Sequence, residues 1–586
     1  MSRKTKASKR KKKQQQPVRR IPNWVYPTVL IGLIVGCFLL RTLPGWDKVF
    51  VDDLVLFRGT DPWYHMRLVD NMMVNFPWPL EWDMVALFPE GMNVGYFPLL
   101  SWMIAIPGQI FNYEVVGALL PPILGALTLI PIYFICKILW KDWVGLVACT
   151  FAMILPTEFF HRSLVGFTDH HILEIFFMAC TILFLILIQK DNRLRWKILG
   201  GVSLGLYLSS WIGGLLLVLP IWLWFFGTFL YKHRKHEEVR PFCMDLFIVL
   251  GLGFLIYLPN IFFIKGTPPF ALAAGVIAIS PIVLYCLSKV LNWKVILGAV
   301  IGIVTISIIG AYSAYPDLME FPRAVLMNPK TTIQEAMLSY PHVLLTCYGI
   351  SFLLFIGGLI FAIKNKQNTL LVVWCAFMFF LMIGQRRWGY YFAISNGILV
   401  GYFIYLIASW MHQSVRIAVV SVILIILVIT SGASMMSIAR TSNYIVGDWY
   451  NTCAWLRENT PEIEGYYELN AEEPSYGILH WWDYGNWITR IARRSPVSNP
   501  MAQTPSTQWQ VFLAHSEEEA EYYLLGIDYI IVSLDELTNK FHAIVNLSHY
   551  DSITWEPFII TLWEEEDLKG WTKIHQEGDI KVYGRI

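Results

Sequence analysis

The sequence predicts a polytopic α-helical membrane protein that carries a mixed α/β domain at its C-terminal end. Its 586 residues are 56% hydrophobic and 15% aromatic, with a mean hydropathy of +0.50, which is more apolar than an ordinary soluble protein. Apolar runs of roughly 17 to 25 residues recur between residues 24 and 436, each long enough to cross a bilayer of about 30 Å. Beyond residue 436 the apolar runs shorten and charges become dense, as expected of a domain in water.

Residues 1–23 form a basic tail before the first apolar run. Residues 1–20 contain ten Lys and Arg and no acidic residue. The positive-inside rule predicts that this tail lies in the cytoplasm, although a nucleic-acid-binding arm would have a similar composition. No small-residue cleavage site follows the first apolar run, so we expect that run to be retained as a membrane span.

About thirteen transmembrane helices are predicted in residues 24–436. The short loops between alternate spans are rich in Lys and Arg, and the positive-inside rule places all of them on the side of the basic tail. With an odd number of spans, residues 437–586 are expected outside the cell. The predicted spans are 24–43, 115–137, 143–159, 172–189, 197–213, 214–231, 243–264, 268–287, 294–313, 342–363, 369–385, 389–410 and 416–436.

The loops on the opposite side of the membrane are fewer and longer, above all those at 44–114 and 314–341. These outer loops hold most of the residues with chemically active side chains. They open on the same side as the C-terminal domain. We therefore expect the functional site to face outward at the membrane surface.

Residues 437–586 are predicted to fold as an acidic extracellular domain. They contain 23 acidic and ten basic residues, a net charge of −13. Cys453 is the only one of the nine cysteines in this part of the chain, so an internal disulfide is excluded there. A helix is expected at 517–525, a buried strand at 528–533 and a hairpin at 571–585, which together predict a mixed α/β domain.

Two outer loops carry residues that can bind a metal ion or a phosphate. Asp61 precedes a Pro in the first loop, where it is equally suited to start a turn or a helix. In the second loop, Asp169, His170 and His171 form a dense group of metal donors at the edge of a span, seven residues after Arg162. Polar groups at such a position are costly unless they are paired or liganded, so this group indicates metal or phosphate binding.

Two further outer segments carry isolated charges. Glu335 lies in a mostly uncharged loop, and Arg386 and Arg387 follow the eleventh predicted span. The two arginines can reach lipid headgroups or hold an anionic substrate. Because Asp61, Asp169, His171 and Glu335 come from separate loops on one side, they can together supply an oxygen-rich site for Mg²⁺ or Mn²⁺. Such an ion would neutralise a phosphate leaving group.

The C-terminal domain contains three Trp within residues 481–487, outside any span. One interpretation is an aromatic cluster that packs the domain on the membrane. The other is a recognition pocket, because indole N–H donors beside Asp483 would suit a small hydroxyl group.

Over essentially its full length the sequence resembles the catalytic subunit of oligosaccharyltransferases, in its archaeal form. The resemblance rests on Trp481-Trp482-Asp483-Tyr484-Gly485, on the spacing of Arg162, Asp169 and His171, and on Thr332-Ile333-Gln334-Glu335. It implies a fold of the GT-C type. It also implies transfer of an oligosaccharide en bloc from a dolichyl phosphate or diphosphate carrier to the Asn of Asn-X-Ser/Thr, with Mn²⁺ or Mg²⁺ as cofactor and a single subunit as the active unit.

The resemblance also implies roles for individual residues. The metal ligands implied are Asp61, Asp169 and His171, and the catalytic residues implied are Asp61, Glu335 and Arg162. The donor phosphate would be bound by Arg162, His170 and Tyr484. The acceptor would be bound by Trp481, Trp482, Asp483, Arg387, Lys540 and Ile544. The family usually has two residues between the Asp and Lys of its last motif, whereas Asp535 and Lys540 are separated by four, so Asp535 receives no role.

Two other classes of protein fit parts of the sequence. Another glycosyltransferase that uses polyprenyl-phosphate sugars, such as a protein O-mannosyltransferase, would share the acid of the first loop but lack the segment 481–485. A polytopic transporter would show charges near the bilayer midplane and internal repeats. Asn546-Leu547-Ser548 is itself a sequon and is either self-glycosylated or a chance match.

Overall fold

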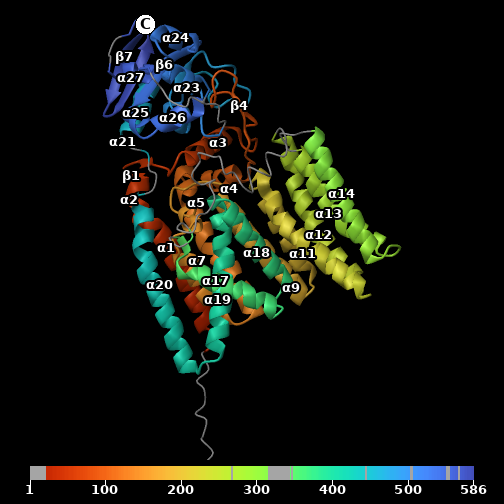
Figure 1. Cartoon of the computed structure of the whole chain (residues 1–586). Coiled ribbons are helices and arrows are strands. Elements are labelled where there is room, and N and C mark those ends of the chain that lie inside the picture. The colour runs from red at the N-terminus through yellow and green to blue at the C-terminus, as the bar shows by residue number, and fades with distance from the viewer. Residues whose placement is uncertain are drawn as a thin grey trace, which may run out of the picture.

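The computed structural model describes residues 22–264, 268–314, 344, 347–441, 445, 447–501, 506–548, 555–564 and 568–586. A bundle of long helices fills one end of the molecule, and an α/β domain with the C-terminus sits at the other (Figure 1). Residues 315–341 of the predicted third outer loop, with Glu335, lie outside the described residues, as does the side chain of Asn546.

Among the described residues, nine helical segments are long and apolar enough to cross a membrane. They contain the helices α1 (Val25–Thr42), α5 (Tyr113–Leu127) with α6 (Leu129–Leu139), α9 (His171–Lys190), α11 (Leu215–Arg234), α12 (Arg240–Tyr257), α13 (Pro268–Leu287), α14 (Trp293–Ala314), α19 (Gly389–Ser409) and α20 (Gln413–Thr441). The prediction of a polytopic helical membrane protein is therefore confirmed.

The remaining predicted spans also coincide with helices, but these are shorter. They are α7 (Asp142–Ile154), α10 (Leu194–Leu208), α17 (Ile350–Lys364) and α18 (Thr369–Gly384). The total of thirteen spans thus stays a prediction. One further apolar helix, α4 (Leu99–Gly108), was not predicted, because its ten residues are too few for a span and it lies inside the first outer loop.

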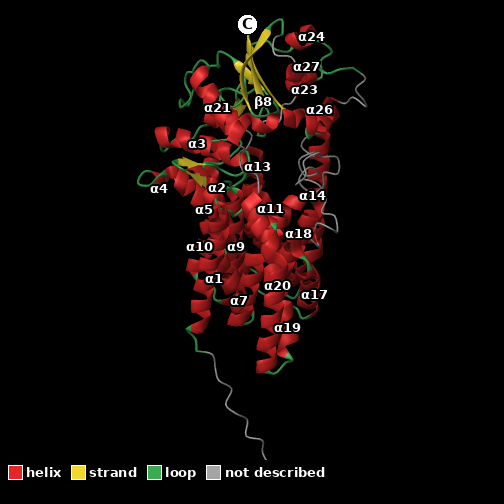
Figure 2. Cartoon of the chain, turned by 90° about the vertical axis from the view of Figure 1, so that its left-hand side faces the viewer, coloured by secondary structure: helices red, strands yellow, loops and turns green. Residues whose placement is uncertain are grey.

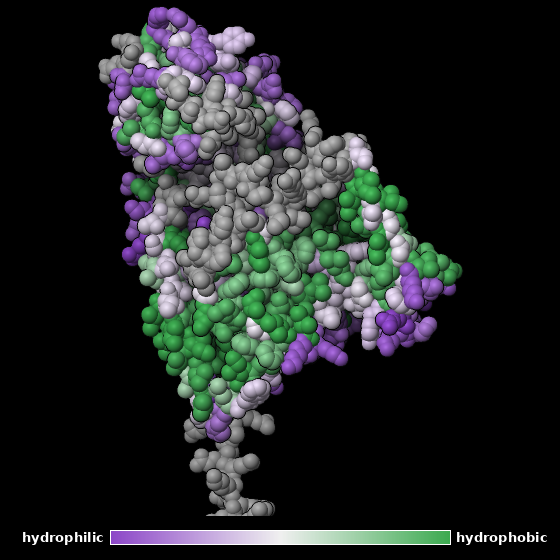
Figure 3. Space-filling model, in the orientation of Figure 1, coloured by the Kyte–Doolittle hydropathy of each residue, from purple (hydrophilic) through white to green (hydrophobic). Residues whose placement is uncertain are grey.

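Burial separates the inner helices from those that face lipid. In the most apolar stretches of α9 and α19, 72% of the residues are buried inside the protein, against 6% in α14 and 11% in α20. Exposed Ile and Val on the outer helices carry no penalty in hydrocarbon, because lipid tails are as apolar as the side chains. In Figure 3 a hydrophobic surface accordingly covers much of the bundle, whereas the C-terminal domain is largely hydrophilic.

The first outer loop is folded. It contains α2 (Trp46–Val49), the antiparallel pair β1 (Phe50–Val51) and β2 (Leu54–Val55), and a second antiparallel pair, β3 (Trp82–Asp83) and β4 (Met92–Asn93). Between the two pairs runs α3 (Asp61–Asn75), which begins at Asp61 with Pro62 in its first turn. The expectation that Asp61 starts a helix is thus confirmed.

The C-terminal domain is built on a four-stranded mixed sheet in the order β5-β6-β8-β7. Strand β5 (Gly477–Leu479) pairs in parallel with β6 (Ile527–Ser533), and β8 (Ile580–Arg585) pairs antiparallel with both β6 and β7 (Trp571–Glu577). Figure 2 shows the strands surrounded by short helices. These are α21 (Gly447–Asn459), α23 (Ser506–Phe512), α24 (Glu517–Tyr522), α25 (Leu534–Thr538), α26 (Phe541–Ser548) and α27 (Phe558–Glu564). The predicted mixed α/β domain, with its C-terminal hairpin, is confirmed.

Candidate active site

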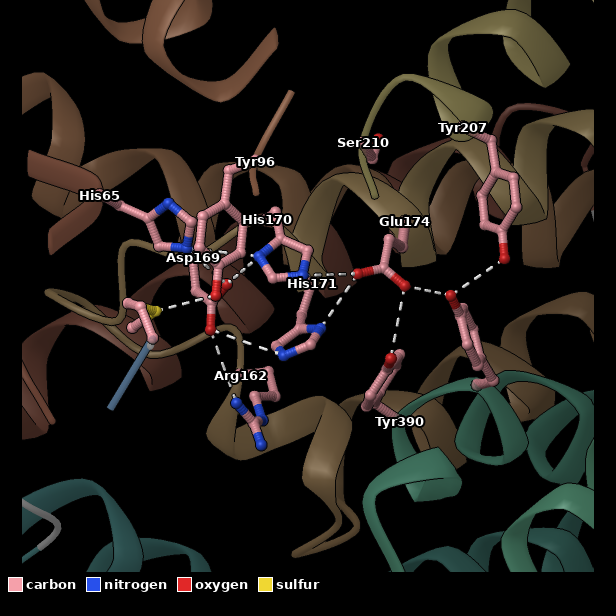
Figure 4. Close-up of polar contacts among 12 residues, drawn as sticks. His65, Tyr96, Arg162, Asp169, His170, His171, Glu174, Tyr207, Ser210 and Tyr390 are labelled. Carbon is pink, nitrogen blue, oxygen red and sulfur yellow. Dashed lines mark hydrogen bonds and ion pairs between the residues drawn. The ribbon is translucent and has the colours of Figure 1, made fainter. Parts of the chain in front are cut away.

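Three histidines surround one carboxylate where α9 begins beside α3 (Figure 4). Asp169 Oδ1 lies 3.2 Å from His65 Nε2 and 2.6 Å from His170 Nδ1. Its other oxygen, Oδ2, lies 3.6 Å from His171 Nε2. The structure thus brings together Asp169, His170 and His171 as the sequence predicted, and it adds His65 from the second turn of α3.

The environment of Asp169 fits a divalent cation. The residue is 1% exposed, and within the part of the chain that the structure describes neither carboxylate oxygen has a hydrogen-bond partner of good geometry, although three ring nitrogens lie close by. Burial opposes ionisation, but the neighbouring His171 and His170 hold the pKa of Asp169 well below its usual range. A buried, ionised carboxylate with unsatisfied oxygens among imidazoles is a set of donors that a metal ion can complete.

The neighbouring imidazole of His65 is also suited to bind as a neutral ligand. Burial lowers the pKa of His65 below its usual value, even though Asp169 opposes the shift. A histidine must be unprotonated at the nitrogen that binds a metal or accepts a proton. His65, Asp169 and His170 offer ligand atoms that all lie within 4.8 Å of one another.

Glu174, in the first turn of α9, belongs to the same cluster, and no role was predicted for it from the sequence. Its Oε1 lies 3.0 Å from His171 Nδ1 and 3.4 Å from His170 Nε2. Its Oε2 accepts hydrogen bonds from the hydroxyls of Tyr390 and Tyr391 on α19. A sequence signal did exist, since Glu174 follows the two histidines by four and three residues at the start of a helix and is the only acid in an otherwise apolar span.

Arg162 joins the cluster from the other side. Its Nη1 lies 3.6 Å from Asp169 Oδ2, and its Nε lies 3.9 Å from the carboxylate of Glu158 on α8 (Glu158–His161). Glu158 in turn accepts a hydrogen bond of 3.2 Å from Arg386 Nε, in the turn η5 (Arg386–Trp388). The structure therefore connects the loop before α9 with the turn that contains Arg387.

Asp61 is the first residue of α3, the helix that also carries His65. It lies four residues before His65, so the two side chains project from the same face of the helix. Its Oδ1 accepts a hydrogen bond of 3.2 Å from the hydroxyl of Thr60. The structure thus places Asp61 one helical turn from a histidine that contacts Asp169.

The aromatic segment of the C-terminal domain forms a second polar site. Asp483 Oδ2 accepts a hydrogen bond of 3.0 Å from Trp481 Nε1 and pairs at 2.7 Å with Lys540 Nζ. The side chain of Trp481 is 1% exposed, whereas Trp482 and Asp483 are partly exposed. Trp481 therefore packs in the core of the protein, whereas Asp483 is partly exposed, and both sequence interpretations of the segment stay predictions.

Further residues of the predicted acceptor and donor sites lie in the same domain. The hydroxyl of Tyr484 donates to Asp535 Oδ2 at 2.7 Å, so it contacts α25 in the C-terminal domain, and burial raises its pKa. Asp535, to which the motif spacing assigned no role, is thus part of the site's surroundings. Ile544 is fully buried on α26, four residues after Lys540. Only glycine fits at position 485, because a Cβ there would lie 2.2 Å from the carbonyl oxygen of Ser498.

A polar joint connects the two sites. Asn486 donates to the carbonyl oxygen of Thr60, the residue before Asp61, at 3.2 Å. Arg490 donates to both oxygens of Asp70 on α3, at 3.0 and 3.1 Å, and to Glu114 on α5 at 2.6 Å. Although burial opposes it, these two carboxylates raise the pKa of Arg490 above its usual value. The segment with Asp483 is therefore anchored to the helix that begins with Asp61.

The fold and the two sites define a polytopic membrane protein with a histidine and carboxylate cluster that could hold a metal ion, and an α/β domain docked over that cluster. The sequence matches the family model "Oligosaccharyl transferase STT3, N-terminal" over residues 33–311 and the "AglB core domain" over residues 446–536. The chain belongs to the oligosaccharyltransferase family.

Several archaeal relatives are similar over most of the chain. Dolichyl-phosphooligosaccharide-protein glycotransferase 3 of Archaeoglobus fulgidus is 24% identical over 89% of this chain and 70% of its own length. Glycotransferase 1 of the same organism is 23% identical over 95% of this chain and 98% of its own. The dolichyl-monophosphooligosaccharide–protein glycotransferase AglB of Haloferax volcanii is 23% identical over 86% of this chain, which spans 63% of that relative.

Solved structures share the fold. The apo crystal structure of an Archaeoglobus fulgidus oligosaccharyltransferase matches with a TM-score of 0.78 and 24% identity, over 89% of this chain and 71% of that one. A structure of that enzyme in complex with Zn and sulfate matches with a TM-score of 0.73 and 25% identity, over 88% of this chain and 69% of that one.

Proposed function

We propose that this protein transfers an oligosaccharide from a dolichyl phosphate or diphosphate carrier to the Asn of Asn-X-Ser/Thr sequons in exported proteins. The observation that carries the proposal is the joint, through Asn486 and Arg490, between a buried histidine and carboxylate cluster and the segment 481–485, in which the carboxylate of Asp483 is partly exposed. The names of the archaeal relatives agree with this reaction. A structure of the Archaeoglobus fulgidus enzyme contains an inhibitory peptide and a dolichol-phosphate, which belong to the two classes of molecule that the reaction uses, a peptide and a lipid phosphate.

The metal would be held by Asp61, Asp169 and His171, with Mn²⁺ or Mg²⁺ as the ion. Nitrogen donors at this cluster favour a transition-metal ion such as Mn²⁺ over Mg²⁺. A related structure contains Zn, which agrees with a divalent site in this family. When bound, the ion would offset the negative charge that develops on the phosphate leaving group.

The protein's own residues bind and orient both substrates. Arg162 and His170 lie beside Asp169 and would bind the donor phosphate, and Tyr484 is proposed for the same role. Asp61 and Glu335 would accept hydrogen bonds from the two N–H groups of the acceptor amide. This contact twists and polarises a nitrogen that is otherwise a poor nucleophile.

The C-terminal pocket would hold the acceptor in register. Asp483, with Trp481 and Trp482, would bind the hydroxyl of the Ser or Thr, and Lys540 and Ile544 would complete the pocket, with Arg387 reaching the peptide from the bundle. Holding the sequon hydroxyl at a fixed distance from Asp61 supplies orientation, which can lower a barrier by several kcal/mol.

The proposed reaction also implies an orientation of the protein in the membrane. We propose a cytoplasmic N-terminus and an extracellular C-terminal domain, because exported acceptors and outward-facing donors meet there. We also propose that the single chain is active without other subunits.

A transfer assay tests the proposal. The purified protein is incubated with a lipid-linked oligosaccharide, a fluorescent Asn-X-Thr peptide and Mn²⁺, and glycopeptide is measured by gel shift. We expect glycopeptide with Asn-X-Thr, none with Asn-X-Ala, and none after chelation of the metal with EDTA. Equal yields from the Thr and Ala peptides would contradict the function assigned to the pocket, and absence of any product would contradict the reaction.

A further inference from the structure

Glu174 is the only acidic residue of α9, and it has no exposed surface. It lies in the first turn of an apolar helix that is long enough to cross the membrane. An ionisable side chain in such a place is costly and is retained where it has specific partners. All of its partners are groups that can donate hydrogen bonds, so the surroundings suit a carboxylate.

The two oxygens of Glu174 have different partners (Figure 4). Oε1 contacts His171 Nδ1 at 3.0 Å and His170 Nε2 at 3.4 Å, on the side of Asp169. Oε2 accepts hydrogen bonds from Tyr390, at 3.3 Å, and from Tyr391, whose hydroxyl lies 3.0 Å from that of Tyr207 on α10. The tyrosines hold one edge of the carboxylate, so the other edge stays turned toward the histidines.

We propose that Glu174 is a positioning residue that fixes the tautomer and ring orientation of His171 for metal binding. A carboxylate at Nδ1 keeps the proton on that nitrogen, which leaves the lone pair on Nε2. Nε2 lies 3.6 Å from Asp169 Oδ2, a separation that lets both atoms bind one ion. The proposal rests on the proposed function only in requiring a metal at Asp169 and His171.

The charges of the cluster support the same conclusion. Asp169 and Glu174 are two buried carboxylates that share His170 and His171, and the arginine beside Asp169, Arg162, also lies near the carboxylate of Glu158. When the imidazoles are neutral, as metal binding requires, the described part of this cluster contains more carboxylates than arginines. A divalent ion bound at Nε2 of His171 offsets this excess, and Glu174 strengthens the imidazole as a donor through the ring.

The affinity of the full-length protein for Mn²⁺ tests this role without any transfer reaction. Mn²⁺ binding is followed by the electron paramagnetic resonance signal of the free ion, on protein in lipid nanodiscs. Glu174→Ala is expected to raise the Kd for Mn²⁺ by about 10- to 100-fold, the range found when such supporting partners are removed. Glu174→Gln is expected to raise it less, because the amide oxygen still accepts from His171 Nδ1.

Asp245→Asn is the matched control. Asp245 is another largely buried acid in a membrane helix, α12, and it pairs with Lys197 at 2.6 Å, away from the histidines. We expect it to leave the Kd for Mn²⁺ unchanged. In a His171→Ala background, Glu174→Gln should have no further effect, because the ring that it positions is gone. If Glu174→Ala does not fold, the comparison of Glu174→Gln with and without His171→Ala still tests the proposal.

Three results would overturn the proposal. They are a Kd within twofold of wild type for both Glu174 variants, an equal effect of Glu174→Gln with and without His171, and absence of Mn²⁺ binding by the wild-type protein. Only the last would also contradict the proposed metal site. Conversely, the expected Mn²⁺ affinities together with no glycopeptide would support the role of Glu174 and contradict the proposed transfer reaction.

Discussion

Asp169 in the histidine cluster and Asp483 in the segment 481–485 differ in exposure and in hydrogen bonding. Asp169 is 1% exposed, and among the described residues its oxygens lack hydrogen bonds of good geometry. The side chain of Asp483 is 26% exposed and is held by Trp481 and Lys540. The first arrangement suits a cation that completes the site. The second is already ordered by the protein and suits a small neutral hydroxyl, which supports our proposal that one site carries the chemistry and the other binds the acceptor.

The largest effect is expected where the chemistry takes place. Asp169→Asn keeps the size of the side chain but removes the charge that holds the ion, so we expect transfer to fall by about 10³-fold. Peptide affinity should remain, because the pocket is untouched. Single-turnover transfer rates and peptide binding by fluorescence anisotropy check the two parts. Loss of peptide affinity with an unchanged rate would reverse the division between the two sites.

The next effect is expected at the joint between the sites. Arg490→Leu leaves Asp70 and Glu114 without their shared cation, and removing one partner of a buried pair costs about 3–5 kcal/mol. We expect faster proteolysis between the bundle and the C-terminal domain, and lower transfer even at saturating peptide. Arg457→Leu, at an exposed position of α21, is the control and should change neither. Normal turnover in the Arg490 variant would show that the joint does not position the sites.

A smaller effect is expected in the pocket itself. Asp483→Ala removes a charged hydrogen-bond acceptor for the sequon hydroxyl, which is worth about 1.5–3 kcal/mol, or roughly 10- to 100-fold in kcat/KM for Asn-X-Thr peptides. The preference for Thr over Ala peptides should fall by the same factor. Asp528→Ala, an exposed acid on β6, serves as control. An unchanged preference for Thr would show that another group binds the hydroxyl.

The smallest effect is expected for Lys540. Its side chain is 35% exposed, so its ion pair with Asp483 is weakened by solvent and contributes about 0.2–1 kcal/mol. Lys540→Ala should therefore raise the KM for peptide by no more than about fivefold, and Lys540→Arg should restore it. Peptide titrations in the transfer assay measure both. A rise of tenfold or more would mean that Lys540 contacts the acceptor directly.

Local patterns predicted much of the fold. The apolar runs coincide with helices because a bilayer requires backbone groups to be paired within each segment, which makes length and hydropathy sufficient signals. Helix α4 was missed because ten apolar residues inside a loop do not reach the length of a span. The hairpin at 571–585 was predicted because its turn and its strands are adjacent in the sequence.

The candidate site was predicted only in part. Asp169, His170 and His171 are adjacent in the chain, so their density alone indicated a site, and the structure places them in contact. His65 was missed because its contact with Asp169 joins two separate elements. Glu174 was missed although it follows His170 and His171 at helical spacing, and its contacts with Tyr390 and Tyr391 come from another helix. Glu335 and the loop around it lie outside the described residues, so their part in the site stays a prediction.

By itself the sequence determined the class of the molecule, its family and the residues of its two motifs, because hydropathy and short motifs are properties of neighbouring residues. Only the tertiary structure decided how these parts meet. It brings together distant elements, as in the contacts of Asn486 with Thr60 and of Arg490 with Asp70 and Glu114. It also sets the contact of Glu174 with His171 on α9. These contacts depend on the relative placement of α3, α9, α19 and the C-terminal domain, which long-range packing sets.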